Sequence, residues 1–171
     1  MGFLGGSFDP VHLGHLMAAH DAFESMALGK VVLVPTAQSP LKETTPRITN
    51  DERLELLQAA IGGDRRFEIS TVELERTGIS YTIDTVETLS SLNPDARLFW
   101  IIGADRAASL NLWHRIDELA FRVEFIVLER PGFGWRPPDL VPGVRIHAIK
   151  SHTCDVSSSE IRRRAHENLP L

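Results

Sequence analysis

Short runs of apolar residues alternate along the chain with longer stretches whose apolar positions recur at helical spacing. The short runs predict β-strands over residues 3–5, 31–34, 67–74, 98–102, 123–128 and 144–149. The longer stretches predict helices over residues 12–28, 49–61, 81–92, 104–110, 114–121 and 157–168. The stretches 36–47 and 130–143 are rich in Pro, Gly or Thr and are predicted to be loops.

This alternation of strand and helix predicts an α/β protein with a Rossmann-like, doubly wound, mainly parallel sheet and helices on both faces. The length of 171 residues fits a single domain over 1–171. In such sheets ligands bind at the carboxyl ends of the strands, where the strand order reverses. The residues that directly follow the predicted strands are therefore the first candidates for chemistry.

Composition narrows the class of protein without identifying a function. Hydrophobic residues make up 43% of the chain and charged residues 24%, unlike disordered, collagenous or coiled-coil sequences. The net charge of −5 disfavours non-specific binding to nucleic acid or to an anionic membrane surface. No apolar run approaches the roughly 20 residues that span a bilayer, and no signal peptide is recognisable. Cys154 is the single cysteine, which excludes an internal disulfide and predicts the reducing cytoplasm.

The segment after the first predicted strand combines glycines with two histidines. Gly5 and Gly6 allow the backbone to approach a ligand closely, and the helix that follows offers unpaired amides and a partial positive charge to an anion. His12 and His15 are spaced i, i+3, so both imidazoles lie on one face of the first helical turn. Two histidines over a phosphate site can donate hydrogen bonds to developing negative charge.

Taken alone, the two histidines leave other interpretations open. His12 could be a surface residue at a helix start, or the pair could bind a metal ion. Zinc-binding helices more often space their histidines i, i+4 around a glutamate, and no cysteine or third histidine is well placed here. The whole string from Gly5 to His15 favours a phosphate site over these alternatives.

That string resembles the nucleotidyltransferase superfamily marked by His-x-Gly-His, whose members join the α-phosphate of a nucleotide to a second phosphate. Three later segments follow in order: residues 80–85 (Ser-Tyr-Thr-Ile-Asp-Thr), 103–105 (Gly-Ala-Asp) with Trp113 downstream, and 156–162 (Val-Ser-Ser-Ser-Glu-Ile-Arg). Together the four segments resemble the bacterial nicotinate mononucleotide adenylyltransferases over almost the whole chain. The resemblance implies a transferase of NAD biosynthesis that makes nicotinate adenine dinucleotide and pyrophosphate from ATP and nicotinate mononucleotide.

The residues of the last two segments can also be interpreted from their chemistry alone. Ser157 and Arg162, at a predicted helix start, can hold phosphate oxygens, although an ordinary N-cap with a solvated arginine face is the alternative. Asp105 can accept hydrogen bonds from ribose hydroxyls or can cap a helix. Trp113 can stack on a pyridine ring, whereas without the resemblance a packed tryptophan is favoured.

The resemblance also assigns residues at the acceptor side. It implies that backbone amides near Thr82 and His114 bind the nicotinate carboxylate, and that Lys42 contacts a phosphate. The family usually has Pro-Pro-His-Lys where this chain has Ser-Pro-Leu-Lys at residues 39–42, and usually tyrosine where His114 stands. Members also usually continue with a further short segment after the last helix.

Three sets of site residues follow. The predicted catalytic residues are His12, His15, Lys42 and Arg162. The predicted ATP-binding residues are Gly6, Ser7, Phe8, His15, Gly103, Asp105, Ser157 and Arg162. The predicted acceptor-binding residues are Lys42, Thr82, Trp113 and His114.

The expected cofactor is Mg²⁺, held mainly by the phosphates of ATP, with no protein metal ligand assigned. ATP and nicotinate mononucleotide are the expected partners, nucleic acid and membrane are not, and a homo-oligomer is left open. Nicotinamide mononucleotide or another phosphorylated acceptor such as phosphopantetheine is the alternative substrate. A non-catalytic nucleotide-binding module is the alternative from another functional class.

Overall fold

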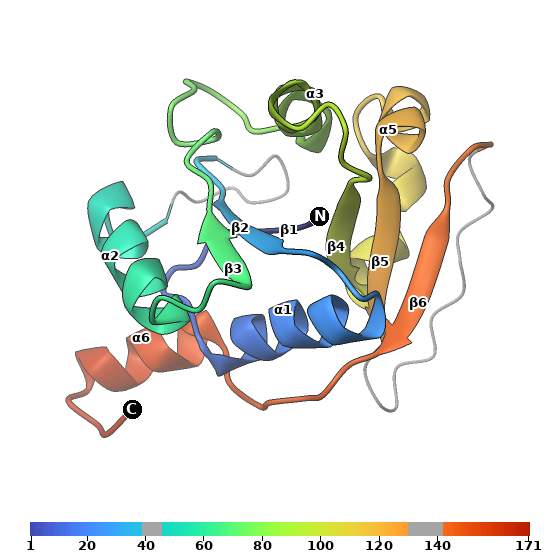
Figure 1. The fold of residues 1–171 in the computed structure, drawn as a ribbon. Helices are drawn as coiled ribbons and strands as arrows, with labels where there is room; N and C mark the ends of the chain where they lie inside the picture. The colour runs from blue at the N-terminus through green and yellow to red at the C-terminus, as the bar shows by residue number, and fades with distance from the viewer. Residues whose placement is uncertain (39–45, 130–141) are drawn as a thin grey trace.

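The computed structural model describes residues 1–38, 46–129 and 142–171, and within them six parallel strands form one sheet (Figure 1). The strands are β1 (Gly2–Gly6), β2 (Val31–Pro35), β3 (Phe67–Ile69), β4 (Phe99–Gly103), β5 (Glu124–Glu129) and β6 (Ile146–Lys150). Their order across the sheet is β3-β2-β1-β4-β5-β6, so the order reverses between β1 and β4. A ligand crevice is expected where these two strands end.

Helices cover both faces of the sheet (Figure 1). They are α1 (Leu13–Ser25), α2 (Asn50–Ile61), α3 (Thr82–Leu92), α4 (Ala104–Ala107), α5 (Ile116–Arg122) and α6 (Ser158–His166), with a 3₁₀ helix η1 (Leu110–Leu112). One buried apolar cluster joins the sheet to α3 and α5, and a second joins it to α1 and α2. Phe3 belongs to the first cluster and Leu4 to the second, because successive side chains of a strand point to opposite faces. The predicted Rossmann-like α/β fold is confirmed.

Most predicted elements are present with ends shifted by a few residues, and two differ more. The predicted strand 67–74 leaves the sheet after Ile69, because the chain turns where the Leu74 amide donates to the Thr71 carbonyl at 2.8 Å. The predicted helix 104–110 is interrupted and becomes α4 followed by η1. At the start of α2 the side chains and amides of Thr49 and Glu52 form a reciprocal capping box.

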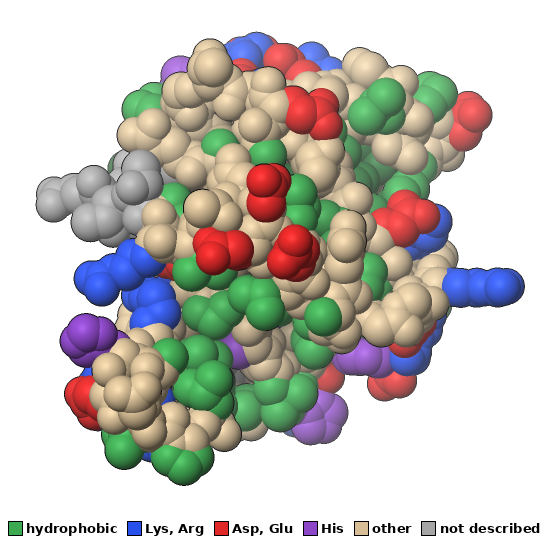
Figure 2. All heavy atoms as spheres, turned by 90° about the vertical axis from the view of Figure 1, so that its left-hand side faces the viewer, with side chains coloured by type: hydrophobic (Ala, Val, Ile, Leu, Met, Phe, Trp, Pro, Cys, Tyr) green, Lys and Arg blue, Asp and Glu red, His purple; other side chains and the backbone are tan. Residues whose placement is uncertain are grey.

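The surface side chains and the lengths of the helices also bear on the class of protein. Figure 2 shows the side that carries α2 and α6, where several acidic side chains lie together near the middle and basic side chains lie mostly toward the edges. No helix among the described residues is long and apolar enough to cross a membrane. Residues 39–45 and 130–141, within the two predicted loops, lie outside the described residues.

A carboxylate on α1 fixes the chain that leaves β6 and leads to α6. Asp21 accepts from the Ser151 hydroxyl at 2.8 Å and from the His152 amide at 2.7 Å, and the His152 ring lies 2.7 Å from its other oxygen. Partial burial raises the pKa of Asp21, but the hydrogen bonds from His152 and Ser151 outweigh this and leave the pKa lowered. The approach of α6 to the start of α1 depends on this connection.

A buried guanidinium connects the ends of β1 and β2. Arg53 on α2 is fully buried, and its Nη1 donates to the carbonyl oxygens of Ser7 and Thr36, each at 2.8 Å. Burial lowers the pKa of Arg53, and the nearby carboxylates of Asp9 and Glu73 partly restore it. Removing this cation would leave both carbonyl oxygens without this donor and would take a positive charge away from the two carboxylates.

We therefore expect Arg53→Met to lower the free energy of unfolding by about 3–5 kcal/mol, the typical cost of breaking a buried charge pair from one side. Urea denaturation followed by circular dichroism measures this loss. The matched control is Arg65→Met, since Arg65 is exposed just before β3. A loss below about 1 kcal/mol in Arg53→Met, or an equal loss in both variants, would contradict the assignment.

Candidate active site

The loop between β1 and α1 is tightly folded around a buried aromatic ring. Phe8 has a left-handed backbone with φ of 43° and is fully buried. A Cβ added to Gly6 would lie 3.1 Å from the Phe8 ring, so glycine is needed there for the loop to close. The buried Phe8 ring cannot contact ATP itself, and a contact through the main chain of this loop stays a prediction.

The two histidines meet at the start of α1. Their ring centroids are 3.8 Å apart, and the His12 amide donates to Nδ1 of His15 at 3.2 Å. A neutral imidazole carries one N–H, so this bond places the proton of His15 on Nε2 and makes that atom a donor. The edge-on contact with Phe8, at 4.9 Å between centroids, fixes the orientation of the His15 ring.

Gly14 provides space for a histidine ring. A Cβ at position 14 would lie 3.1 Å from two atoms of the His12 imidazole, so a larger residue would displace the ring from the helix start. The glycine of the His-x-Gly-His pattern therefore allows the two imidazoles to lie against each other, which the spacing of the histidines alone did not predict.

The start of α6 lies against the same loop. Arg162 donates through Nη1 to the Asp9 carbonyl oxygen, and the Ser158 hydroxyl donates to the Pro10 carbonyl oxygen at 2.8 Å. The Ser157 hydroxyl accepts from the Glu160 amide at 3.2 Å, so Ser157 is the N-cap of α6. The structure thus brings Ser157 and Arg162, far along the chain, to the loop that carries His12.

Asp9 organises a third segment at this place. Its carboxylate accepts from the amides of Arg47 and Ile48 at 3.1–3.2 Å, and Arg162 Nη1 lies 3.3 Å from Oδ2. A negative charge beside a phosphate site would oppose ligand binding, but here it is engaged by two amides and one guanidinium. Lys42, predicted to help neutralise phosphate charge, lies outside the described residues.

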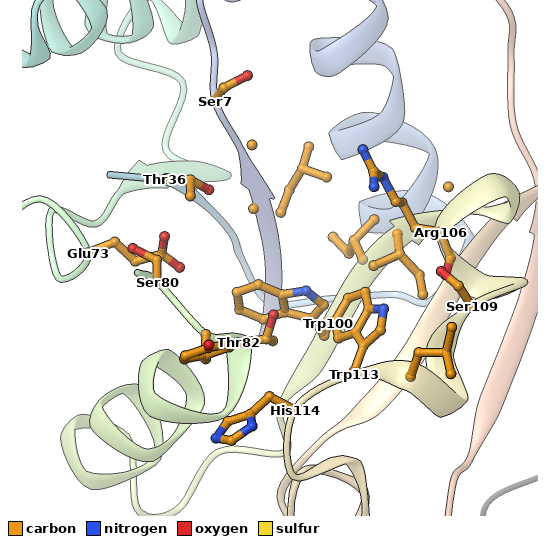
Figure 3. A pocket seen from close by; sticks show the side chains of 18 residues that line it. Ser7, Thr36, Glu73, Ser80, Thr82, Trp100, Arg106, Ser109, Trp113 and His114 are labelled. Carbon is orange, nitrogen blue, oxygen red and sulfur yellow. The ribbon is translucent and has the colours of Figure 1, made fainter. Parts of the chain in front are cut away.

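A cavity of about 540 Å³ opens beside the loop (Figure 3). This volume is within the range of about 300–1,000 Å³ that holds small-molecule ligands. The predicted site residues that line it are Gly6, Ser7, Thr82, Gly103, Trp113 and His114. The lining does not include His12, His15 or Arg162, but Gly6 and Ser7 of the lining belong to the same segment between β1 and α1 that leads to the two histidines.

Aromatic rings and a helix start form one end of the cavity. Trp113 lies there in edge contact with Phe125, at 6.1 Å between centroids, and the His114 ring lies 4.3 Å from that of Tyr81. Thr82 is the first residue of α3, where amides without helical partners and the helix dipole favour an anion. This end can therefore bind a flat ring that carries a negative group.

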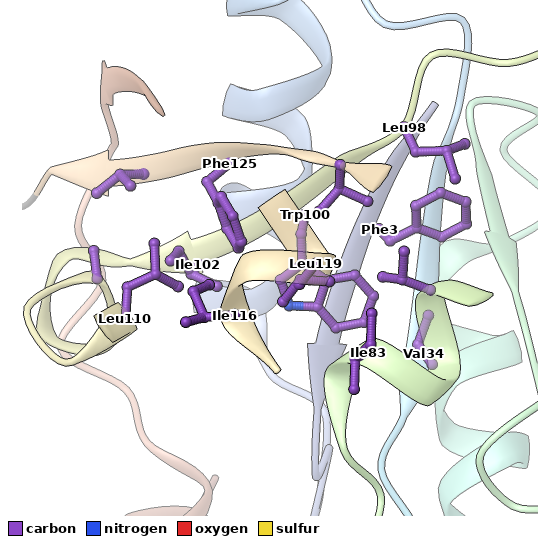
Figure 4. Close-up of a cluster of buried hydrophobic side chains, with 14 of the residues drawn as sticks. Phe3, Val34, Ile83, Leu98, Trp100, Ile102, Leu110, Ile116, Leu119 and Phe125 are labelled. Carbon is purple, nitrogen blue, oxygen red and sulfur yellow. The ribbon is translucent and has the colours of Figure 1, made fainter. Parts of the chain in front are cut away.

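Trp100 is a cavity residue that the sequence analysis missed. It lines the cavity and also packs in the core cluster that joins the sheet to α3 and α5 (Figure 4). A Cβ at Gly5 would lie 2.9 Å from Cζ2 of Trp100, so that glycine makes room for the indole. The apolar run 98–102 indicates burial for this tryptophan, but nothing in the sequence indicates that one edge reaches a ligand cavity.

Glu73 is a second missed residue. It is buried, lines the cavity and accepts from the Thr85 hydroxyl at 2.9 Å. Burial raises the pKa of its carboxyl, and hydrogen bonds from Thr85 and Ser80 partly offset this. Because Ser80 and Thr85 flank the start of α3, Glu73 helps to hold the amides of that helix in place.

Asp105 lies at the start of α4, and one of its two predicted roles is excluded. The N-cap of α4 is Gly103, without a side-chain cap, so the capping alternative for Asp105 is wrong. Its carboxylate is mostly exposed and stands over Gly103, where an added Cβ would lie 2.5 Å from Oδ1. Asp105 is thus next to the cavity rim and outside its lining, and a contact with ribose stays a prediction.

A metal centre built from side chains is not formed by the described part of the chain. No three His, Cys, Asp or Glu residues come together there in a group that could hold a metal ion. Among the described residues, none therefore joins His12 and His15 as a third metal ligand.

Comparison with known proteins assigns the family. Residues 3–164 match the family model described as "Cytidylyltransferase-like". The chain is 48% identical over 171 residues to the "Probable nicotinate-nucleotide adenylyltransferase" of Opitutus terrae, covering 100% of this chain and 88% of the relative. It is 43% identical over 172 residues to the protein of the same name from Halalkalibacterium halodurans, covering 100% and 82%.

A solved structure has the same fold. The nicotinic acid mononucleotide adenylyltransferase of Plasmodium falciparum, complexed with NaAD, superposes with a TM-score of 0.74 at 21% identity, over 95% of this chain and 82% of that one. Identity this low supports the fold alone. The family model and the relatives aligned over the whole chain show the family as well as the fold. The chain belongs to the cytidylyltransferase-like family and, within it, to the nicotinate-nucleotide adenylyltransferases.

Proposed function

We propose that this chain transfers the adenylyl group of ATP to nicotinate mononucleotide, which forms nicotinate adenine dinucleotide and pyrophosphate in NAD biosynthesis. The observation that carries this assignment is the segment from β1 to α1, which contributes Gly6 and Ser7 to the lining of a cavity with aromatic walls and carries the paired His12 and His15. An acceptor in the cavity and a triphosphate over α1 would bring their phosphates together along that segment.

The reaction needs positioning and charge stabilisation more than covalent catalysis. An oxygen of the acceptor 5′-phosphate attacks the α-phosphorus of ATP in line, a new P–O bond forms, and the bond to pyrophosphate breaks. His12 and His15 hold the α- and β-phosphates, with Nε2–H of His15 as a donor of defined tautomer. Arg162 and Ser157 hold the leaving pyrophosphate, and Lys42 neutralises charge.

The remaining predicted contacts divide between the two substrates. Trp113 stacks on the nicotinate ring, and amides at Thr82 and His114 bind its carboxylate at the helix-start end of the cavity. On the ATP side we assign the main chain of Gly6, Ser7 and Phe8 to phosphate contacts. Gly103 and Asp105 are assigned to the ribose.

Mg²⁺ is the metal that we propose for the reaction, held mainly by phosphate oxygens of ATP because this hard cation prefers oxygen ligands and keeps several waters. The donors that the described residues bring to this place are imidazoles and a guanidinium, which suit phosphate better than Mg²⁺. When bound, the ion would neutralise phosphate charge that the protein cations leave uncompensated.

The acceptor is tested by one assay. Pyrophosphate release is measured with ATP and, in turn, nicotinate mononucleotide, nicotinamide mononucleotide and phosphopantetheine. We expect nicotinate mononucleotide to give the highest kcat/KM, because α3 presents its positive end to a ring carboxylate. A higher kcat/KM for either other acceptor would replace the proposed substrate, and no release with any of them would indicate a binding module.

His15→Ala tests the assignment of charge stabilisation. Losing one well-placed donor to developing charge costs roughly 2.7–4 kcal/mol in the barrier, so we expect kcat to fall about 100- to 1,000-fold. Circular dichroism should show an unchanged fold. His166→Ala is the matched control, since His166 is exposed in the last turn of α6 and should retain wild-type turnover. Near wild-type kcat in His15→Ala would exclude the catalytic role.

Trp113→Ala tests ring stacking. Stacking of a base on an aromatic side chain is worth about 1–3 kcal/mol, so KM for nicotinate mononucleotide should rise about 5- to 150-fold. KM for ATP should change little, because ATP is assigned to the other part of the site. Trp113→Phe keeps a ring and should recover most of the loss. An unchanged KM for the mononucleotide in Trp113→Ala would contradict the stacking assignment.

A further inference from the structure

The cavity that we assign to the acceptor contains a cationic side chain that none of the predicted sets includes. Among the described residues that line it, Arg106 is the one Lys or Arg. A phosphate monoester carries a charge of about −1.5 to −2 at neutral pH. A mononucleotide phosphate in this cavity needs a compensating cation, and His12, His15 and Arg162 lie outside the lining.

Arg106 is placed at the ligand edge of the sheet by its position in the chain. It is the third residue of α4, which starts directly after β4, the strand on the far side of the switch point from β1. In Figure 3 the guanidinium of Arg106 extends away from Trp113 and His114, toward the end of the view that contains Ser7. The cation and the aromatic rings therefore occupy different ends of one cavity.

The guanidinium is weakly engaged within the described part of the chain. Its Nε lies 3.8 Å from Oδ2 of Asp105, which is too long for a hydrogen bond, and both side chains are largely solvent-exposed. The other arginines near the site differ, since Arg53 and Arg162 donate to backbone carbonyls. Arg106 can thus turn its N–H groups to a ligand without giving up a strong internal contact.

The length of a mononucleotide connects the two ends of the cavity. With the pyridine ring at Trp113, the 5′-phosphate must lie at the end formed by Gly6 and Ser7, where it can reach the α-phosphorus of ATP. That is the end toward which Arg106 extends. A guanidinium can bind two phosphate oxygens in a fixed fork geometry and leave the third oxygen for attack.

We propose that Arg106 binds the 5′-phosphate of the mononucleotide acceptor and so determines that phosphorylated acceptors are selected over the corresponding nucleosides. This proposal rests on the proposed function, because it takes the cavity to be the acceptor site. The contact forms on binding and no bond to Arg106 is made or broken, so its loss should act on acceptor affinity and much less on ATP.

The test compares a phosphorylated ligand with the same ligand lacking its phosphate. Isothermal titration measures binding of nicotinate mononucleotide, nicotinate riboside and ATP to the wild type, Arg106→Met and Arg106→Lys. Arg122→Met is the matched control, because Arg122 on α5 has similar exposure, pairs with Glu87 and does not line the cavity. Steady-state KM values for both substrates are measured on the same proteins.

We expect Arg106→Met to weaken mononucleotide binding at least tenfold, which is about 1.4 kcal/mol, while riboside and ATP binding change less than twofold. Arg106→Lys should recover part of the loss, since it keeps the charge without the fork. KM for the mononucleotide should follow its affinity. Arg122→Met should match the wild type.

Three results would overturn the proposal. Equal weakening of mononucleotide and riboside would mean that Arg106 shapes the cavity and does not recognise the phosphate. Weaker ATP binding with unchanged mononucleotide binding would assign Arg106 to ATP. A wild type that binds both acceptor forms equally, or neither, would also contradict it. A wild type that prefers the mononucleotide but releases no pyrophosphate would instead contradict the proposed function, and the comparison of variants would still decide on Arg106.

Discussion

The geometry of the site depends on a buried guanidinium that joins the ends of two neighbouring strands. Arg53 donates to the carbonyls of Ser7 and Thr36, so the loops that leave β1 and β2 are held at a fixed separation beneath the site. The charge requires compensation, which the nearby carboxylates of Asp9 and Glu73 supply. Each carboxylate then fixes a further element: Asp9 engages α6 through Arg162, and Glu73 engages α3 through Thr85. The ATP side and the acceptor side are thus linked through one buried cation.

This network explains how a chain of net charge −5 can present an anion site. Asp9 and Glu73 are engaged by amides, a hydroxyl and a guanidinium group, which reduces their repulsion of an incoming phosphate, whereas Asp105 beside the cavity rim stays mostly exposed. Positive potential comes from a few local sources, which are the starts of α1, α3 and α6 and the side chains of Arg106 and Arg162. Figure 2 shows acidic side chains gathered near the middle of the face with α2 and α6, so the net charge is an average over the surface and does not describe the local charge at the site.

The sequence predicted the fold well because strand and helix periodicities are local and strong. It failed at 67–74, where alternating apolar residues continue past the strand, since Val72 packs into the core from a turn and mimics a strand position. The motifs predicted which loops form the site. The roles of individual side chains depend on contacts between segments that are distant in the sequence, and the motifs did not predict those contacts. Gly14 accommodates the His12 ring and Gly5 the Trp100 ring, and neither pairing has a signature in one sequence. Arg106 and Glu73 were missed because each becomes a cavity residue only when α4 and the turn after β3 are placed beside β1.

The division of the site into two parts has a consequence for how binding energy is used. In the proposed reaction, contacts at Trp113 and Thr82 would lie at the other end of the cavity from the reacting phosphates, so they would not stabilise the transition state directly. They contribute by fixing where the acceptor phosphate lies, which converts an encounter of two like-charged phosphates into an oriented attack. Repulsion between those phosphates is then the main remaining electrostatic cost. In the proposed arrangement this repulsion arises between the cavity and the start of α1. In the proposed arrangement, the two histidines of α1 and the guanidinium of Arg106 would provide donors to the phosphates of ATP and of the acceptor, where this cost arises.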